Sequence, residues 1–137
     1  MELSNFETRP LPFVPDVTAP DGSDVRILLA LAGGSMAHFE LSPGETSIAV
    51  AHRTVEEIWY CLKGHGEMWR KQPDCEQVVA LKPGICLTLP IGTHFQFRTL
   101  GEKPFSAVGI TMPPWPNVNE AYKVTGKWET TFSRAER

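Results

Sequence analysis

Prolines and glycines interrupt this chain so often that long helices are excluded. The 137 residues include 12 prolines and 11 glycines. Proline removes a backbone donor, and glycine lowers the stability of helix interiors. Turn-forming pairs at 33–34, 43–44, 73–74 and 83–84 separate short runs rich in Val, Ile, Leu, Phe and Thr. This pattern is typical of short antiparallel strands joined by tight turns.

The runs between these turns predict nine strands and no amphipathic helix. The predicted strands are residues 24–32, 35–42, 46–52, 56–63, 66–71, 76–82, 85–90, 93–99 and 104–112. A series of this kind indicates an all-β sandwich or barrel. We expect one domain, because a chain of this length buries a single core without disulfides.

Proline-rich segments flank the predicted strands. Residues 1–23 predict an extended N-terminal arm, and residues 24–112 predict the barrel. Residues 113–137 predict a C-terminal arm that packs on the barrel; from 117 onward it is either irregular with one short strand near 122–128 or partly disordered at its charged end.

Composition and charge exclude several classes of partner. The net charge is −3, and the charged residues (21%) are interspersed, which argues against a nucleic-acid surface. No apolar run reaches the roughly 18–20 residues of a membrane helix, and no secretory signal is visible. The three cysteines, Cys61, Cys75 and Cys86, form no C-x-x-C pair. We therefore expect a cytoplasmic protein without nucleic-acid or membrane partners.

Two stretches in the middle of the chain resemble the motifs of the cupin family. The first cupin motif is G-x5-H-x-H-x3,4-E-x6-G; here Glu57 lies seven positions before Gly64, and His52 falls on the second histidine. The second motif is G-x5-P-x-G-x2-H-x3-N, and its glycine and proline skeleton is present in residues 84–92. The resemblance implies a double-stranded β-helix, the RmlC-like jelly-roll barrel.

The chain departs from the cupin motifs at three positions. Val50 stands in place of the first histidine, Phe95 in place of the second motif's histidine, and Thr99 in place of its asparagine. His94 lies one residue before the expected position, and a one-residue offset in a strand turns a side chain to the opposite face. His94 would reach the site only if the turn at 92–94 were one residue tighter than usual.

The departures bear on the metal that most cupins bind. The resemblance implies three histidines and one glutamate around Fe, Mn, Ni or Zn, and a catalytic site of this kind needs at least three protein ligands. This chain retains two, His52 and Glu57. We therefore expect no resident cofactor and only weak binding of divalent metal.

Strand alternation predicts which side chains share a face of their strand, and the resemblance implies that seven of these side chains face the barrel interior. They are Val50, His52, Glu57, Trp59, Cys61, Phe95 and Phe97. The ionisable pair, His52 and Glu57, is the candidate for catalysis. Burying two ionisable groups in a small core costs free energy, so their presence there indicates a function. The four apolar residues other than Cys61 are candidates to contact substrate, and Cys61 is expected to be an inert buried thiol.

The remaining histidines are expected to lie outside the site. His38 is predicted on the outer face of its strand, opposite Phe39 and Leu41. His65 is predicted in a solvent-facing turn. Either His38 or His94 would have to reach the pocket if the chain built an unusual metal site.

These observations favour three functions, in descending order. The first is a metal-independent enzyme for a small molecule, an isomerase, epimerase, cyclase or lyase, with His52 and Glu57 as base and acid. The second is a non-catalytic protein that binds or senses a small molecule. The third is a metal-dependent oxygenase or isomerase with an unusual ligand set.

The strand at 56–63 also predicts a homodimer. Its outer face presents Ile58, Tyr60 and Leu62, a second apolar row opposite the interior one. Two apolar faces on one strand indicate that something covers the outside. Trp115 and Trp128 are candidates to cap a barrel end or to pack on the partner subunit.

Overall fold

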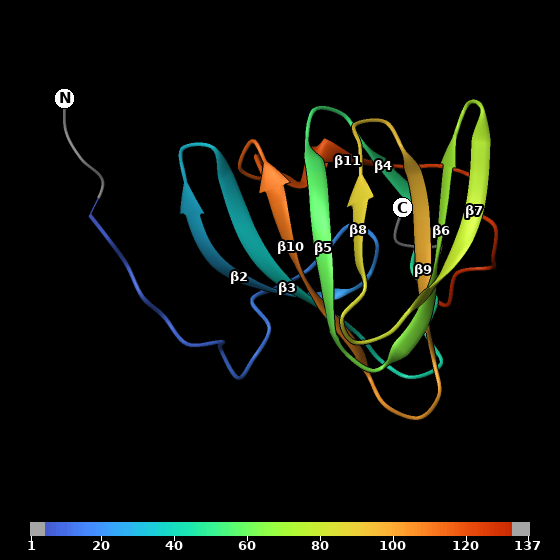
Figure 1. The fold of residues 1–137 in the computed structure, drawn as a ribbon, viewed down its shortest axis with the longest axis horizontal. Coiled ribbons are helices and arrows are strands. Elements are labelled where there is room, and N and C mark those ends of the chain that lie inside the picture. Colours follow the sequence, from blue (N-terminus) through green and yellow to red (C-terminus); the bar gives the residue numbers. More distant parts are fainter. Residues whose placement is uncertain (1–4, 133–137) are drawn as a thin grey trace.

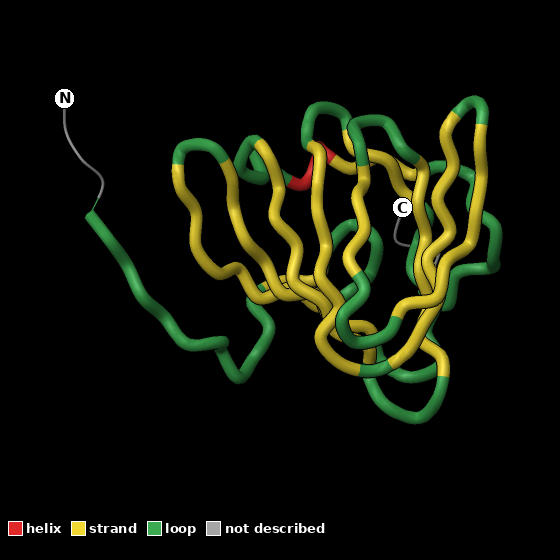
Figure 2. The backbone as a smooth tube through the Cα atoms, in the orientation of Figure 1, coloured by secondary structure: helices red, strands yellow, loops and turns green. Residues whose placement is uncertain are grey.

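The chain forms two antiparallel sheets packed face to face around one core (Figures 1 and 2). The structure is a computed structural model that describes residues 5–132. The strands are β1 (Val17–Thr18), β2 (Asp24–Leu31), β3 (Gly34–Leu41), β4 (Val50–His52), β5 (Glu56–Lys63), β6 (His65–Gln72), β7 (Cys75–Leu81), β8 (Cys86–Leu89), β9 (His94–Leu100), β10 (Phe105–Met112) and β11 (Ala121–Lys123). One sheet has the order β1-β2-β3-β10-β5-β8, and the other has the order β11-β4-β9-β6-β7.

This architecture confirms the predicted all-β jelly roll. Each of the nine predicted strands corresponds to one of β2–β10. The only helix among the described residues is a single 3-10 turn, Val118–Glu120, drawn in red in Figure 2. No helix in the described part of the chain is long and apolar enough to cross a membrane.

One predicted strand is shorter than expected. The run at 46–52 forms a strand only from Val50. Before it, Ser47 pairs with Phe97, since the Ser47 amide donates to the Phe97 carbonyl and the Ser47 hydroxyl accepts from the Phe97 amide. Thr46 forms an isolated antiparallel bridge with Arg98 of β9, and its carbonyl also accepts from the hydroxyl of Thr130. The strand is interrupted between these residues and Val50, because the Ile48 amide donates to the carbonyl of Asp21 and the Ala49 carbonyl accepts from the amide of Val124.

Alternation along β5 separates the core from the surface. Glu57, Trp59 and Cys61 are 4%, 1% and 0% exposed and point between the sheets. The intervening residues, Ile58 and Tyr60, are 45% and 47% exposed on the outer face. The inner row joins the core formed by Leu41, Val50, Met68, Leu81, Leu87, Leu89, Phe95, Phe97, Phe105 and Ala107.

A buried glutamine holds the C-terminal segment on the outside of β9. Gln96 is 1% exposed, and its Oε1 accepts from the amides of Lys127 and Trp128 at 3.0 and 2.9 Å. Its Nε2 donates to the carbonyls of Ser47 and Trp128. Trp128 also lies under the guanidinium of Arg98, 4.2 Å from the ring centroid. Residues 133–137 of the predicted C-terminal arm lie outside the described residues.

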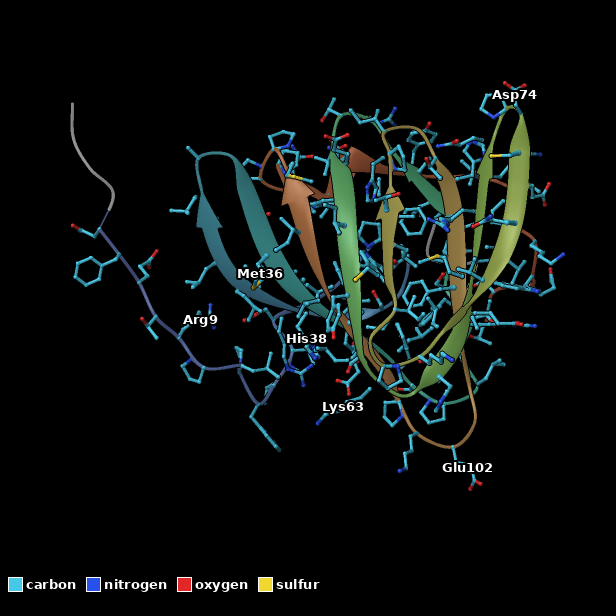
Figure 3. All side chains as sticks on the ribbon, in the orientation of Figure 1. Arg9, Met36, His38, Lys63, Asp74 and Glu102 are labelled. Atoms are coloured by element: carbon cyan, nitrogen blue, oxygen red, sulfur yellow. The ribbon has the colours of Figure 1, made fainter. Side chains whose placement is uncertain are left out.

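The N-terminal segment leads away from β2 along one side of the molecule (Figures 1 and 3). Arg26 of β2 fixes its base, because the guanidinium donates to the carbonyls of Pro12 and Phe13 and to the carboxylate of Glu40. Residues 1–4 of the predicted arm lie outside the described residues.

The prediction that His38 is an ordinary outer-face histidine needs correction. His38 stands opposite Arg26 in the β2–β3 register and lies on the outer face, yet it is only 6% exposed. Burial, reinforced by the positive charge of Arg26, holds the pKa of His38 below its usual value. Contacts with Arg26 are long-range in sequence, so the local pattern around His38 did not reveal this burial.

Candidate functional site

His52 ends β4 and points into one end of the barrel. Its backbone is fixed on both sides, because it pairs with Ala121 of β11 and its carbonyl accepts from the amide of Gly92. The imidazole is 6% exposed. It meets two aromatic rings edge-on, Phe95 with a centroid separation of 5.3 Å and Trp115 at 5.0 Å.

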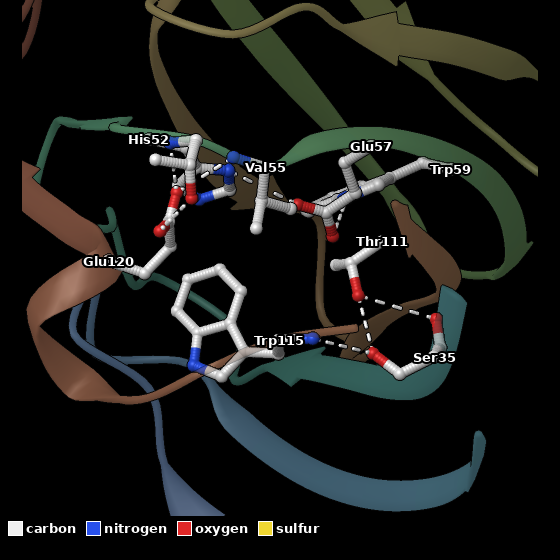
Figure 4. Close-up of polar contacts among 9 residues, drawn as sticks. Ser35, His52, Val55, Glu57, Trp59, Thr111, Trp115 and Glu120 are labelled. Carbon is white, nitrogen blue, oxygen red and sulfur yellow. Dashed lines mark hydrogen bonds and ion pairs between the residues drawn. The ribbon is translucent and has the colours of Figure 1, made fainter. Parts of the chain in front are cut away.

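Glu57 reaches the same place from β5. Its backbone faces Leu89 on one side and Thr111 on the other. Oε1 of Glu57 lies 3.6 Å from Nδ1 of His52, and Oε2 accepts a 2.8 Å hydrogen bond from Nε1 of Trp59 (Figure 4). The sequence-predicted pair therefore converges inside the barrel, and Trp59 orients the carboxyl group.

A glycine makes room for this arrangement. Gly109 of β10 stands opposite Trp59. A Cβ atom at this position would lie 2.7 Å from Oε2 of Glu57 and 2.6 Å from the ring of Phe39. Phe39 stacks on Trp59 with a centroid separation of 5.1 Å. The absence of a side chain at 109 lets the carboxyl group and two aromatic rings share one layer of the core.

Burial sets the protonation states of the pair. It lowers the pKa of His52 to about 4, partly opposed by the negative charge of Glu120. It raises the pKa of Glu57 to about 8, partly opposed by the hydrogen bond from Trp59. Near neutral pH the contact therefore joins a neutral imidazole to a protonated carboxyl group, and it is not an ion pair.

Glu120 is a second acidic neighbour of His52 that sequence reasoning missed. Its carboxylate accepts from the amide and hydroxyl of Thr54 and from the amide of Val55. Burial alone would raise the pKa of Glu120, but these hydrogen bonds hold it below its usual value. Glu120 lies more than sixty residues from His52 in sequence. The one local signal for an ordered segment is Asn117, which caps the helical turn that contains Glu120.

Trp115 follows β10 in the chain and covers the His52 side of the pair. Its amide donates to the hydroxyl of Ser35, which in turn hydrogen bonds to the hydroxyl of Thr111 (Figure 4). The indole then lies against His52. Sequence analysis named Trp115 as a candidate to cap a barrel end or to pack on a partner subunit, and in the structure it lies against His52 of its own chain.

The four predicted substrate-contacting residues are all buried, at 3% exposure or less. Phe95 touches His52, and Trp59 touches Glu57. Val50 pairs with Phe95 across β4 and β9, while Phe97 packs edge-on against Trp59 in the middle of the core. Cys61 is fully buried, and burial raises the pKa of its thiol to about 11.

Two cavities in the described part of the chain lie away from this pair. The larger, about 520 Å³, separates the C-terminal segment from the outer side of β9. Its lining residues include Ile48, Gln96, Lys123, Trp128 and Phe132. The smaller, about 310 Å³, lies beside Arg70 and Thr93. Neither is lined by His52 or Glu57.

The donor set at the site does not fit a catalytic metal ion. Val50 and Phe95 occupy the positions of two histidines in the family pattern, and neither can coordinate. His94 does not replace them, because it alternates with Phe95 on β9 and pairs with Lys71 of β6. Among residues 5–132, no three His, Cys, Asp or Glu side chains are grouped as metal ligands.

Comparisons with solved structures find the same fold in proteins of low sequence identity. KdgF from Halomonas sp. is 17% identical with a TM-score of 0.59, over 67% of this chain and 79% of that one. The oxalate decarboxylase of Lactobacillus farciminis is 18% identical with a TM-score of 0.66, over 74% of this chain but only 31% of that enzyme. A putative sugar phosphate isomerase from Acidithiobacillus ferrooxidans is 18% identical with a TM-score of 0.55, over 66% and 58% of the two chains.

The sequence itself carries a family signature. A comparison with curated proteins finds no match. The profile of the cupin domain, however, matches residues 37–111, from β3 to β10. This match spans more than half of the chain and includes both motif regions. The protein belongs to the cupin family.

Proposed function

We propose that this protein is a metal-independent acid–base enzyme that isomerises or epimerises a small organic molecule, with His52 as general base and Glu57 as general acid. The observation that supports this assignment is the 3.6 Å approach of His52 Nδ1 to Glu57 Oε1 inside an apolar barrel. A buried structural pair would gain most as an ion pair, yet burial keeps both partners neutral here.

The protonation states suit a coupled proton transfer. Between pH 4 and pH 8 the imidazole is free to accept a proton and the carboxyl group holds one to donate. In the proposed step, His52 removes a proton from carbon next to a carbonyl group. The C–H electron pair becomes the new C=C bond, and Glu57 protonates the carbonyl oxygen. Return of the two protons to different positions or faces gives the isomer, with no change in oxidation state.

A hydroxy-carbonyl compound is the substrate class that this step requires. The carbonyl group acidifies the neighbouring C–H bond, and a hydroxyl group on that carbon allows isomerisation as well as epimerisation. The putative sugar phosphate isomerase among the structural neighbours has a name consistent with such chemistry. That likeness supports the fold, while the proposal depends on the residues of this chain.

Substrate must reach the pair past Trp115. The indole lies against His52, and its backbone is tied to Ser35 through one hydrogen bond. Movement of the segment around Trp115 would open the end of the barrel where His52 and Glu57 meet. Closure over the substrate would then exclude water from the reacting carbon.

Exchange of solvent deuterium tests the proposal before the physiological substrate is identified. A set of small hydroxy-carbonyl compounds is incubated with the protein in D₂O, and loss of the C–H signal is followed by proton NMR. We expect exchange with at least one compound, reduced about a hundredfold or more by His52→Gln and by Glu57→Gln. His94→Gln is the matched control and should leave exchange unchanged. Exchange that survives in both site variants would contradict the assignment.

A non-catalytic binding protein is the second candidate. One observation favours it: the cavity of about 520 Å³ lies outside the barrel and away from His52 and Glu57. This volume is within the range of small-molecule sites. Saturable binding of a compound that is recovered unchanged, and that Trp128→Ala weakens while Glu57→Gln does not, would favour this function over catalysis.

A further inference from the structure

The inner faces of β6 and β7 become polar toward the turn that joins the two strands. On β6, Met68 is fully buried in the core, and the next residues on the same face are Arg70 and Gln72. On β7, Val79 packs against the core, and the next inner residue toward the turn is Gln77, which pairs with Arg70. These side chains lie at an edge of the barrel, where β7 ends one sheet and β8 ends the other (Figure 1). Polar groups between two sheets need hydrogen-bonding partners, and a ligand can supply them at this edge.

The cavity of about 310 Å³ opens beside these polar residues. We define this edge cavity by five lining residues with polar side chains, which are Arg70, Lys71, Gln72, Gln77 and Thr93. Two of the five side chains are cationic, and no Asp or Glu from the described part of the chain lines the cavity. Its local charge is therefore positive, although the whole chain has a net charge of −3. A positive cavity with neutral hydrogen-bonding groups is complementary to an anion.

The guanidinium of Arg70 is held in one orientation at the edge cavity. Its Nη1 donates to the carbonyl of Thr88 on β8 at 2.8 Å, and its Nη2 donates to Oε1 of Gln77 on β7 at 2.6 Å. These two bonds use two of the five N–H groups of a guanidinium. Nε is buried without an acceptor in the described part of the chain, and Arg70 forms no ion pair with an acidic side chain among residues 5–132. A fixed guanidinium with unused donors and no counter-ion is preorganised to bind an anion.

Gln72 and Thr93 bring two segments together at the cavity. Nε2 of Gln72 donates to Oγ1 of Thr93 at 3.1 Å, which joins the end of β6 to the loop before β9. Thr93 is 3% exposed. Its hydroxyl accepts this bond and therefore retains its own O–H donor for a ligand. Lys71 is exposed beside them, and its ammonium group on a flexible stem can follow an anion into the cavity.

We propose that the edge cavity binds the phosphate group of a small phosphate monoester. A phosphate monoester carries about −1.5 to −2 charges at pH 7, which two cationic side chains balance. Arg70 would contact the phosphate oxygens through its unused N–H groups, and Lys71 and Thr93 would supply further donors. The cavity volume lies at the lower end of the roughly 300–1,000 Å³ of ligand pockets, which suits this group with a short carbon chain. Neither His52 nor Glu57 lines the edge cavity, so this site is independent of the proposed catalytic function.

Isothermal titration calorimetry at constant ionic strength in Tris chloride tests the proposal. The probes are glycerol 3-phosphate, glycerate and glycerol, which share a three-carbon chain and differ in the anionic group. We expect saturable binding of glycerol 3-phosphate, binding of glycerate at least about tenfold weaker, and no binding of glycerol. Arg70→Gln should weaken the binding of glycerol 3-phosphate about a hundredfold. Arg70→Lys should weaken it about tenfold, because lysine keeps the charge but lacks the planar fork of donors.

Arg98→Gln is the matched control for the loss of charge. It removes a guanidinium from the opposite face of the same sheet, where Arg98 pairs with Glu67, and it should leave binding unchanged. Lys71→Gln and Thr93→Val keep the test valid if Arg70→Gln does not fold. Each changes one lining side chain and should weaken the binding of glycerol 3-phosphate about tenfold. Circular dichroism establishes which variants retain the fold.

Cysteine alkylation locates the bound anion. Cys75 is exposed and lines the edge cavity, whereas Cys86 is exposed on β8 and does not line it. Iodoacetate is negatively charged and iodoacetamide is neutral. The ratio of the alkylation rates with iodoacetate and iodoacetamide should be about tenfold higher at Cys75 than at Cys86. Glycerol 3-phosphate should slow the alkylation of Cys75 alone, and Arg70→Gln should remove the preference of Cys75 for iodoacetate.

Three results would overturn the proposal. The first is a wild-type protein that binds no glycerol 3-phosphate. The second is binding that is unchanged in the folded variants at Arg70, Lys71 and Thr93. The third is binding that is lost in Lys123→Gln, in the larger cavity, and kept in Arg70→Gln. Glycerate that binds as tightly as glycerol 3-phosphate would also contradict the proposal, because the site would then recognise a carboxylate.

Discussion

Trp59 and Glu57 share the inner face of β5, and the indole Nε1 donates a 2.8 Å hydrogen bond to Oε2 of the carboxyl group. This bond favours the ionised form of Glu57 and therefore opposes the rise in its pKa that burial causes. Trp59 therefore fills the core and also lowers the pKa of Glu57, the acid of the proposed reaction.

Removing the indole nitrogen of Trp59 should shift the alkaline limb of the pH–activity profile to higher pH. In Trp59→Phe the stacking on Phe39 remains possible, but the hydrogen bond is lost. The pKa of Glu57 should then rise further above about 8, so that the rate of deuterium exchange declines at higher pH than in the wild type. Stability should fall by about 1 kcal/mol. Trp69→Phe is the matched control, because Trp69 donates to Glu76 instead, and it should leave the limb in place.

The neutral pair should also give stability an optimum in mildly acidic solution. The folded pKa of Glu57, about 8, lies above its unfolded value of 4.5, so its contribution is lost as pH rises between these values. The folded pKa of His52, about 4, lies below 6.5, so its contribution is lost as pH falls through that window. Between pH 4.5 and 6.5 the contributions of Glu57 and His52 change with pH by equal and opposite amounts, so the free energy of unfolding stays level. From pH 6.5 to 8, Glu57 alone should reduce the free energy of unfolding by about 2 kcal/mol.

Urea denaturation at a series of pH values measures this effect. The comparison is between the wild type and Glu57→Gln, because other groups titrate equally in both proteins. The decline of the wild type between pH 6.5 and 8 should be absent from the variant. If both proteins lose the same stability over this range, Glu57 is already ionised in the folded protein and the assigned acid is wrong.

A methyl group at position 109 should disrupt the site without replacing an ionisable residue. The added carbon of Gly109→Ala would lie 2.7 Å from Oε2 of Glu57 and 3.2 Å from Cδ1 of Trp59. We expect a stability loss of about 1–3 kcal/mol and a large loss of exchange activity, because the carboxyl group must move. Gly33→Ala is the control, since its added carbon meets nothing within 4 Å. Equal stability and activity in the two variants would contradict the geometry of this layer.

Strand alternation predicted the inner residues of the site because the period of two holds along each strand. His52, Glu57, Trp59 and Phe95 are all buried as expected. The motif spacing also placed His52 and Glu57 on neighbouring elements that meet in space. Alternation is a local property of each strand, whereas the meeting of His52 and Glu57, which lie on strands of different sheets, was predicted from the resemblance to the cupin motif.

The residues that sequence analysis misjudged are governed by contacts across the fold. His38 is buried on the outer face beside Arg26, which holds the arm, and no pattern within its own strand records this. Glu120 reaches the turn at Thr54 only after the chain has completed the barrel. Trp115, which lies against His52, is held by Ser35 eighty positions away. Such pairings require the three-dimensional structure.

Glu120 provides the last test, because its charge and its hydrogen bonds can be separated. Glu120→Gln removes the charge that raises the pKa of His52, so this pKa should fall further below about 4. The amide oxygen can still accept from the amides of Thr54 and Val55. Glu120→Ala leaves those two buried donors unpaired and should cost about 1–3 kcal/mol for each.

The imidazole signals of His52, followed by NMR over a pH titration, give its pKa without any substrate. The expected order is wild type above Glu120→Gln, with Glu67→Gln equal to the wild type because Glu67 pairs with Arg98 on the outside of the barrel. A wild-type His52 that titrates near 6.5, with no response to Glu120→Gln, would mean that the imidazole is hydrated. A hydrated imidazole would bind a proton at mildly acidic pH. That result would therefore remove the physical basis for pairing a neutral base with a protonated acid.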